Sequence, residues 1–358
     1  MHRTLRSSLC AIAVATLIPL SACTSDAAPA GTHSASPSAT TVNAPAVTPP
    51  NGTAFTDIYG STIHAHGGGV LLHNGVYYWA GENRGVDDKF RAVSLYRSDD
   101  LVHWTFVSDI LTQHSDPELA VATIERPKLM YNAATDTFVL WMHWENGTDY
   151  SQARVAVATS PRIDEPFTYQ RSFRPLDFES RDLSVFTDAD GTGYLVSATA
   201  ANADLQIYRM DATYTGVDSV VARLWPGAFR EAPAMFVRDG TYFLLTSGAT
   251  GWTPNQAKYA TATSPDGPWS DLRDVGNDTA FGSQAAFVLP VQGSSGTDYL
   301  YLGDRWAGAW GGLVNQSTYV WLDIEFPRSD EMTLVLSEAL RIDARRGTII
   351  PTDAGGRR

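Results

Sequence analysis

The sequence predicts an all-β fold, a five-bladed β-propeller, on three observations. A block of a short polar signature, an apolar strand, a turn and a second aromatic strand recurs five times between residues 64 and 306, at intervals of about 50 to 57 residues. Asn74-Gly75 and Asp239-Gly240 separate such paired strands, and both dipeptides favour tight hairpins because they tolerate positive φ. No segment shows convincing helical periodicity over ten residues or more. Repeated units of several short strands are typical of propeller blades.

Each block is expected to contribute the two inner strands of one blade. In chain order the expected pairs are 67–72 with 77–79, 125–130 with 138–141, 180–186 with 194–196, 231–236 with 242–245, and 283–288 with 299–302. Outer strands are expected at 93–96 and 104–106, 155–158 and 167–169, and 259–262 and 267–269. The segment from 319 to 349 is expected to complete the ring.

The N-terminus predicts export. Arg3 and Arg6 precede an apolar run at 9–20, which is too short for a comfortable membrane span and is typical of a signal peptide. The run ends in Leu-Ser-Ala before Cys23, which resembles a bacterial lipobox, with ordinary cleavage nearby and an incidental cysteine as the alternative. We therefore expect a signal peptide at 1–22, a lipid on Cys23, a flexible Ala/Ser/Thr/Pro linker over 23–52 and the propeller over 53–358.

The expected location is outside the cytoplasm, as an outward-facing cell-envelope lipoprotein or a secreted protein that meets the membrane only through its lipid. The other cysteine, Cys10, lies in the signal, so the mature fold is expected to have neither a disulfide nor a thiol nucleophile. We expect a monomer, because no apolar outer patch is evident.

The charge balance argues against a nucleic-acid partner. The formal net charge is −13 and becomes −15 once the two signal arginines are removed, and no basic cluster offsets it. Neutral glycans fit better, because hydrogen bonds and the apolar faces of aromatic rings hold them irrespective of net charge. Ten Trp and fifteen Tyr supply such faces.

Polar residues at the starts of the inner strands indicate where the chemistry lies. The inner strands of a propeller begin near its axis, so Glu125, Asp182, Glu231 and Gln284 are expected to converge on one funnel. Two or more carboxylates in one pocket are typical of the active site of a glycosidase. The alternative for each residue alone is that it caps or crosslinks its own blade.

Four motifs carry a resemblance to a known family over about residues 55 to 350. They are Glu125-Arg126-Pro127-Lys128, Ser180-Arg181-Asp182, Glu231-Ala232-Pro233-Ala234 and Gly303-Asp304-Arg305-Trp306. In this order and spacing the chain resembles glycoside hydrolase family 43, and most closely its exo-β-1,3-galactanase branch. The resemblance implies an inverting hydrolase that releases galactose from β-1,3-galactan, the backbone of plant arabinogalactan.

The resemblance also implies catalytic roles. Glu231 matches the general acid, and Asp182 matches an aspartate that tunes the acid and orients the sugar, with an ion pair to Arg181 or Arg126 as the alternative. Most members carry the base, an aspartate, where this chain has Gly67, and a glycine accepts no proton. In the galactanase branch a glutamine is proposed to position the water, which implies Gln284.

Glu125 is the rival water activator, because an amide is a poor base. The favoured division gives Gln284 the water and makes Glu125 a substrate-binding carboxylate. Glu82 matches the contact to the axial 4-hydroxyl of galactose, with a surface pair to Arg84 as the alternative. Further substrate contacts are expected from Tyr150, Asn202, Thr250, Trp252 and Arg126. Trp144, Trp306 and Trp310 are either stacking platforms or core residues.

No catalytic metal and no cofactor are expected. His64 and His66 are two residues apart on an expected strand and point to opposite faces, so both cannot readily ligate one ion. A single structural cation such as calcium on the axis stays compatible with the resemblance.

Two other functions remain open at this point. One is α-L-arabinofuranosidase or β-xylosidase activity, for which an aspartate at Gly67 would be expected. The other is a glycan-binding propeller without catalysis, which would have no need of an acid such as Glu231.

Overall fold

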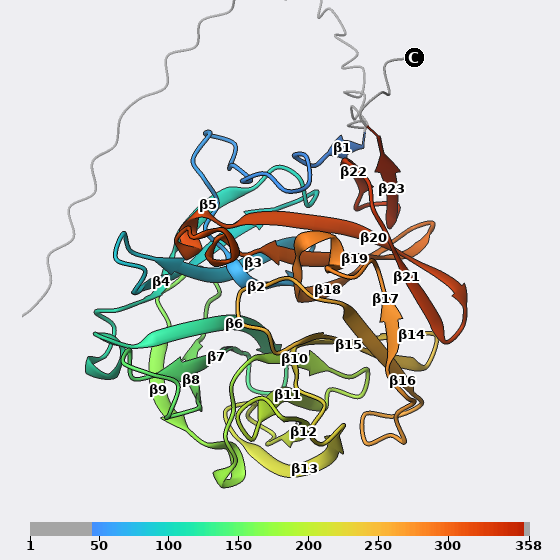
Figure 1. The fold of residues 1–358 in the computed structure, drawn as a ribbon. Coiled ribbons are helices and arrows are strands. Elements are labelled where there is room, and N and C mark those ends of the chain that lie inside the picture. The colour runs from blue at the N-terminus through green and yellow to red at the C-terminus, as the bar shows by residue number, and fades with distance from the viewer. Residues whose placement is uncertain (1–44, 354–358) are drawn as a thin grey trace, which may run out of the picture. The chain divides into compact units, whose positions relative to one another are not determined.

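The computed structural model describes residues 45–353, and their regular structure is strands with a few short 3₁₀ turns. The all-β prediction is confirmed, but the prediction of five blades is wrong. Six sheets stand in a propeller arrangement, five with four strands and one with three (Figure 1). The extra sheet pairs β1 (Ala46–Val47), β22 (Ala339–Asp343) and β23 (Thr348–Thr352), from opposite ends of the described chain. It carries no copy of the repeat, so periodicity could not count it.

Each four-stranded sheet is an antiparallel run of consecutive strands. The first sheet contains β2 (His66–His73), β3 (Val76–Arg84), β4 (Phe90–Ser98) and β5 (Thr105–Thr112). The second contains β6 (Thr123–Asn132), β7 (Thr137–Glu145), β8 (Arg154–Ser160) and β9 (Thr168–Phe173). The third contains β10 (Leu183–Thr187), β11 (Gly193–Thr199), β12 (Asp204–Met210) and β13 (Val217–Leu224).

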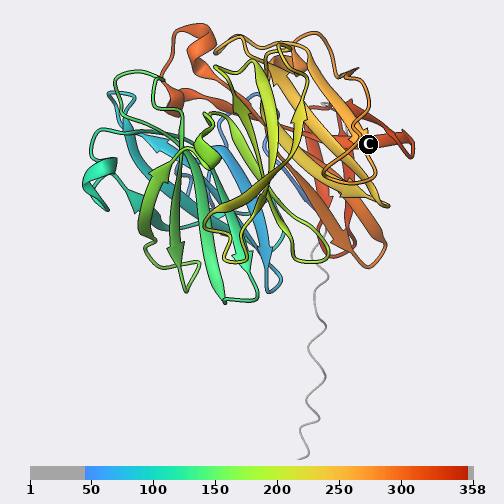
Figure 2. The same ribbon diagram turned by 90° about the horizontal axis from the view of Figure 1, so that it is seen from below.

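The fourth sheet contains β14 (Arg230–Arg238), β15 (Thr241–Gly248), β16 (Ala257–Ala262) and β17 (Arg273–Val275). The fifth contains β18 (Gln284–Gly293), β19 (Gly296–Arg305), β20 (Thr318–Arg328) and β21 (Glu331–Val335). Short 3₁₀ turns lie at η1 (Pro117–Leu119), η2 (Pro175–Asp177), η3 (Ala280–Gly282), η4 (Ala307–Trp310) and η5 (Val314–Gln316). Strands β2, β6, β10, β14 and β18 contact one another in this order around the axis, and β18 contacts β2. Figure 2 shows the neighbouring sheets side by side from a second direction.

The predicted hairpin turns are confirmed. Asn74 and Gly75 join β2 to β3 with φ values of 50° and 79°, and Asp239 and Gly240 join β14 to β15 with φ values of 49° and 80°. Two successive residues with positive φ match the right-handed twist of the strands that they connect.

A repeated bulge turns the starts of three inner strands toward the axis. The register shifts after His66 in β2, after Glu125 in β6 and after Glu231 in β14. The next residue in each strand has a positive φ: 57° at Gly67, 51° at Arg126 and 50° at Ala232. A bulge bends its strand and redirects the local side chains. The same type of bulge therefore occurs at the polar motif of each of these three blades.

Aromatic packing joins the fifth sheet to the first. The ring of Trp79 lies 4.9 Å from that of Tyr319 and 5.1 Å from that of Trp321, and all three side chains are buried. Leu340 and Ile349 of the extra sheet join the same cluster. The first and last four-stranded sheets are thus held together by side-chain packing.

The predicted signal peptide, Cys23 and most of the predicted linker lie outside the described residues. Residues 45–52, which belong to the predicted linker, are described and include β1. Among the described residues no helix is long and apolar enough to cross a membrane.

Candidate active site

A cavity of about 290 Å³ lies where the polar motifs of the blades converge. Its lining residues are Glu82, Arg84, Glu125, Arg126, His143, Tyr150, Arg181, Asp182, Asn202, Glu231, Ala249, Gly251, Trp252, Gln284 and Trp306. Every site residue predicted within the propeller is among them except Thr250. The Thr250 hydroxyl donates to the Thr253 carbonyl at 2.7 Å within its own loop, while its neighbours Ala249 and Gly251 line the cavity.

Glu231, at the start of β14, is a buried carboxyl that faces the cavity. Its Oε1 accepts from Gln284 Nε2 at 3.1 Å, and its Oε2 accepts from Asn202 Nδ2 at 3.0 Å. Burial and, to a smaller extent, the negative charge of Asp182 raise the pKa of Glu231 to about 8. The side chain is therefore protonated at neutral pH and can donate a proton to a bound molecule.

Asp182 lies beside this acid, immediately before β10. Its Oδ2 accepts from Arg126 Nε at 2.7 Å and from the backbone N–H of Ala232 at 3.1 Å. The ion pair with Arg126, which the sequence left as an alternative, is formed. Because Ala232 follows Glu231, the same contacts also fix the aspartate next to the acid.

The Gln284 amide is held at all of its polar positions. Its Oε1 accepts from Trp306 Nε1 at 2.8 Å and from a guanidinium N–H of Arg126. Its Nε2 donates to Ser247 Oγ at 2.8 Å as well as to Glu231. Trp306 and Arg126 can only donate, so the oxygen of Gln284 accepts from both, and its nitrogen donates to Ser247 and Glu231. In this arrangement the side chain orients the Glu231 carboxyl.

Glu125, in β6, is held by three donors. Arg84 Nη2 and the Tyr150 hydroxyl donate to its Oε1 at 2.9 and 2.7 Å, and His143 Nδ1 lies 3.2 Å from its Oε2. Burial favours the neutral form, but the hydrogen bond from His143 and the charge of Arg84 outweigh it and hold the pKa of Glu125 well below its usual range. Glu125 is therefore a fixed anion at any working pH.

Glu82, near the end of β3, is buried at the wall of the cavity and accepts from Arg84 Nε at 2.9 Å. The pair with Arg84 therefore forms inside the molecule and not on its surface. Burial raises the pKa of Glu82 to about 7, and the charge of Arg84 opposes that shift. Arg84 thus bridges two carboxylates, Glu82 and Glu125.

The architecture and the motifs agree with what known proteins show. "Glycosyl hydrolases family 43" matches residues 70–283. The chain belongs to glycoside hydrolase family 43. No curated protein sequence matches it.

Solved structures of exo-β-1,3-galactanases and of a β-1,3-galactosidase are similar to this hydrolase. An exo-β-1,3-galactanase from Clostridium thermocellum is 50% identical over 86% of this chain and 69% of its own, with a TM-score of 0.84. An exo-β-1,3-galactanase from Phanerochaete chrysosporium, solved with galactose, is 35% identical over 85% of this chain and 70% of its own, with a TM-score of 0.79. A family 43 β-1,3-galactosidase, solved with galactodeoxynojirimycin, is 31% identical over 81% and 99%, with a TM-score of 0.74. The expected resemblance to the galactanase branch is confirmed.

Gly67, where the resemblance led us to expect an aspartate in other members, has a structural reason to be glycine. A Cβ atom on Gly67 would lie 2.8 Å from Glu82 Oε1 and 3.3 Å from Arg126 Cα, and φ is 57°. Its N–H donates to Asp304 Oδ2 at 2.9 Å. The Glu82 carboxylate therefore occupies the space that a side chain at position 67 would need.

Three ionisable cavity residues were absent from the predicted substrate and catalytic set: Arg84, His143 and Arg181. Arg84 could have been found from its place two residues after Glu82 on one face of β3, and His143 from its pairing opposite Glu125 in the β6–β7 ladder. Of the three candidate tryptophans only Trp306 lines the cavity. Trp144 packs in the core, and Trp310 is 55% exposed with the Arg305 guanidinium 4.7 Å from its ring centre.

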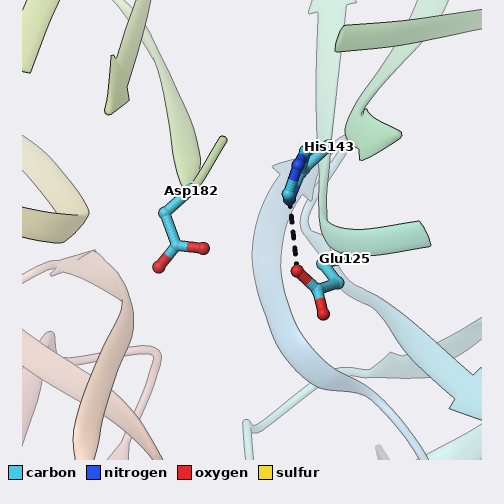
Figure 3. Close-up of side chains that lie close together, drawn as sticks. All are labelled: Glu125, His143 and Asp182. Atoms are coloured by element: carbon cyan, nitrogen blue, oxygen red, sulfur yellow. Dashed lines mark hydrogen bonds and ion pairs between the residues drawn. The ribbon is translucent and has the colours of Figure 1, made fainter. Parts of the chain in front are cut away.

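Glu125, His143 and Asp182 lie close together, with potential ligand atoms within 4.8 Å of one another (Figure 3). Both ring nitrogens of His143 already face carboxylates, Nδ1 that of Glu125 and Nε2 that of Glu145 at 3.0 Å. Burial opposes protonation, but hydrogen bonds to these two carboxylates raise the pKa of His143 to about 9. An imidazolium has no lone pair for a metal, so the cluster fits a charge network better than a metal centre.

Proposed function

We propose that this hydrolase removes galactose from the non-reducing end of β-1,3-galactan with inversion at the anomeric carbon. The galactanase and galactosidase activities of the similar proteins support this substrate. The volume of about 290 Å³ also supports it, because it lies at the lower end of small-molecule sites and suits a terminal sugar.

The observation that carries the proposal is the state of Glu231. A glycosidase needs a carboxyl that is still protonated near neutral pH and lies beside the scissile oxygen. Glu231 has a pKa raised to about 8, and two amides hold its two oxygens inside the cavity. We assign it the role of general acid: the glycosidic C–O bond breaks, and the leaving oxygen takes the proton of Glu231.

The second half of the reaction needs a water molecule on the opposite face of the sugar. We assign its positioning to Gln284, whose nitrogen would exchange its contact with Glu231 or with Ser247 for the water when a sugar occupies the cavity. We give Glu125 the role of binding sugar hydroxyls. Three donors and a very low pKa make Glu125 a weak base, which supports the binding role. A water that attacks the anomeric carbon would lose its proton to solvent or to a neighbouring group as the new C–O bond forms.

Recognition of the sugar is assigned to the opposite walls of the cavity. Glu82, Arg84 and Glu125 supply charged acceptors and donors for hydroxyls, which give stronger hydrogen bonds than neutral groups. Trp252 and Trp306, with ring centres 5.5 Å apart, supply apolar surface for a sugar ring.

The test is an assay with three substrates. The purified protein and its Glu231→Gln variant are incubated with β-1,3-galactan, p-nitrophenyl α-L-arabinofuranoside and xylo-oligosaccharides. We expect galactose alone, with the α-anomer formed first by NMR, and a loss of about 10² to 10⁴-fold in the variant. Glu165→Gln, at a surface position, is the matched control and should keep full activity. Release of arabinose or xylose without galactose would point to another family activity, and binding without product would point to a glycan-binding protein.

A further inference from the structure

A second pair of buried ionisable residues lies behind Glu125. His143 and Glu145 lie two residues apart on β7, so both side chains project from the same face of the strand. Both are almost completely buried, and Glu145 is not a lining residue of the cavity. Their Nε2 and Oε1 atoms are 3.0 Å apart.

We propose that His143 and Glu145 are positioning residues, which fix the orientation and the charge of Glu125 and hold the loop that carries Tyr150. The proposal rests on the galactanase function only where activity is measured. The ring nitrogens of His143 and the carboxylate oxygens of Glu145 perform this role without contacting the substrate.

The first route runs through His143. The imidazole bridges the two carboxylates, with Glu125 on one nitrogen and Glu145 on the other. Only the doubly protonated ring donates on both sides, so this bridge requires the imidazolium. A charge-assisted bond fixes a carboxylate more firmly than a bond from a neutral donor.

The second route runs through the loop between β7 and β8. Glu145 accepts from the backbone N–H groups of Gln152 and Ala153, each at 2.9 Å. Ala153 has a φ of 45°, so the chain turns sharply where Glu145 holds it. The same loop carries Tyr150, whose hydroxyl donates to Glu125 at 2.7 Å. Glu145 therefore acts on Glu125 twice, through the ring of His143 and through the loop.

The charges around His143 explain why the bridge is stable near neutral pH. Glu145 faces it from its own strand, Glu125 faces it from β6, and the Tyr150 ring lies 5.8 Å away. Arg84 of β3 binds the far side of Glu125, and Asp182 lies across the cavity. The two adjacent anions outweigh burial and raise the pKa of His143 to about 9. Removal of the Glu145 charge should lower this pKa, so that the ring becomes neutral at a lower pH.

The first measurement needs no substrate. In ¹⁵N-histidine-labelled protein, NMR should show one imidazolium that stays doubly protonated up to about pH 9, and His143→Gln should remove that signal. In Glu145→Gln the transition should move down by at least about one pH unit. An imidazole that titrates near its usual pH in the wild type, or one that Glu145→Gln does not move, would overturn the proposal. A failure of the galactanase function leaves this readout intact.

The second measurement is the pH dependence of kcat/KM on a β-1,3-galacto-oligosaccharide. The ratio of Glu145→Gln to wild type should lie below one even at low pH, because an amide has one oxygen and cannot accept from both loop N–H groups. It should fall about a further tenfold as the ring loses its proton, because a small misplacement of a site group is costly. A ratio that does not depend on pH would contradict the proposal. If Glu145→Gln does not fold, His143→Gln tests the same bridge and should lower kcat/KM by a similar factor at every pH below about 9. His103→Gln, which removes an exposed histidine paired with Asp100, should change neither readout.

Discussion

At the scale of the residue, Glu231 combines burial with a protonated carboxyl. Its pKa of about 8 means that the proton is present over the neutral range and is lost as the pH rises through 8. Asn202, Gln284 and Asp182 surround the carboxyl. The charge of Asp182 adds to the effect of burial, whereas the hydrogen bond from Gln284 favours ionisation. The positive charge of Arg126 also favours ionisation, and it reduces the upward pKa shift of Glu231 without cancelling it.

The raised pKa predicts how stability depends on pH. A buried acid with a pKa above its unfolded value binds its proton more tightly in the folded state, so the free energy of unfolding falls as pH rises from about 4.5 through 8. Glu231→Gln removes the group that ionises. We therefore expect the variant to gain stability relative to wild type between pH 6 and pH 9 in urea unfolding, with Glu165→Gln showing no such trend. If the free energies of unfolding of variant and wild type differ by the same amount at pH 6 and at pH 9, the burial of an ionisable Glu231 is contradicted.

Gly67 carries the second prediction at this scale. Gly67→Ala places a Cβ atom 2.8 Å from the Glu82 carboxylate at a φ that side chains rarely adopt. We expect a loss of about 1 to 3 kcal/mol in the free energy of unfolding, together with a higher KM because Glu82 must move. Gly191→Ala, at a φ of 83° with open space around it, controls for the backbone strain alone. Equal losses of unfolding free energy in the two variants would show that the contact with Glu82 does not contribute to the destabilisation.

At the scale of the element, the loop after β15 shapes one wall of the cavity. Asn255 binds Gly248 through both backbone groups, at 2.6 and 2.8 Å, and so closes the loop that carries Trp252. The Trp252 ring packs on Gly308 of η4 and on Trp306, and therefore links the fourth and fifth sheets across the cavity.

Trp252→Ala should raise KM for β-1,3-galacto-oligosaccharides by about tenfold, with a smaller change in kcat, because the ring supplies binding surface and no proton. The measurement is steady-state kinetics. Trp310→Ala removes another exposed tryptophan, outside the cavity, and should leave both constants unchanged. A loss confined to kcat would argue against a binding role for Trp252.

At the scale of the whole molecule, a propeller must join its first and last sheets. Tyr319 and Trp321 of β20 meet Trp79 of β3 at this junction, and the extra sheet covers the same cluster. The carboxylates of the cavity come from several sheets, so their mutual distances depend on the closure of the ring.

Trp321→Ala should therefore destabilise the entire fold. Truncation of a fully buried Trp typically costs about 3 to 5 kcal/mol, and the side chain is 1% exposed. We expect unfolding at a lower urea concentration, whether it is followed by the loss of sheet structure or by the loss of galactose release. The exposed Trp310→Ala variant is the matched control. Unfolding in which the two signals separate would mean that the sheets are stable without ring closure.

The repeat and the polar motifs were enough to predict an all-β propeller and the convergence of Glu125, Asp182, Glu231 and Gln284. Both depend on local information: strand alternation, turn dipeptides and the position of each motif at the start of an inner strand. The number of sheets was not available in this way, because β1 and β22 are far apart in the chain and share no pattern. The position of Thr250 was also missed, since its own loop satisfies the hydroxyl.

The sequence by itself determined which residue types reach the axis, because blade periodicity and motif position are properties of short segments. Only the tertiary structure decided the partners and the charge of those residues. The space beside Gly67 is filled by Glu82, and the pKa of His143 is raised because Glu125 and Glu145 enclose it. Burial and electrostatic neighbours are set by elements that meet in space from different parts of the chain, so no local pattern encodes them.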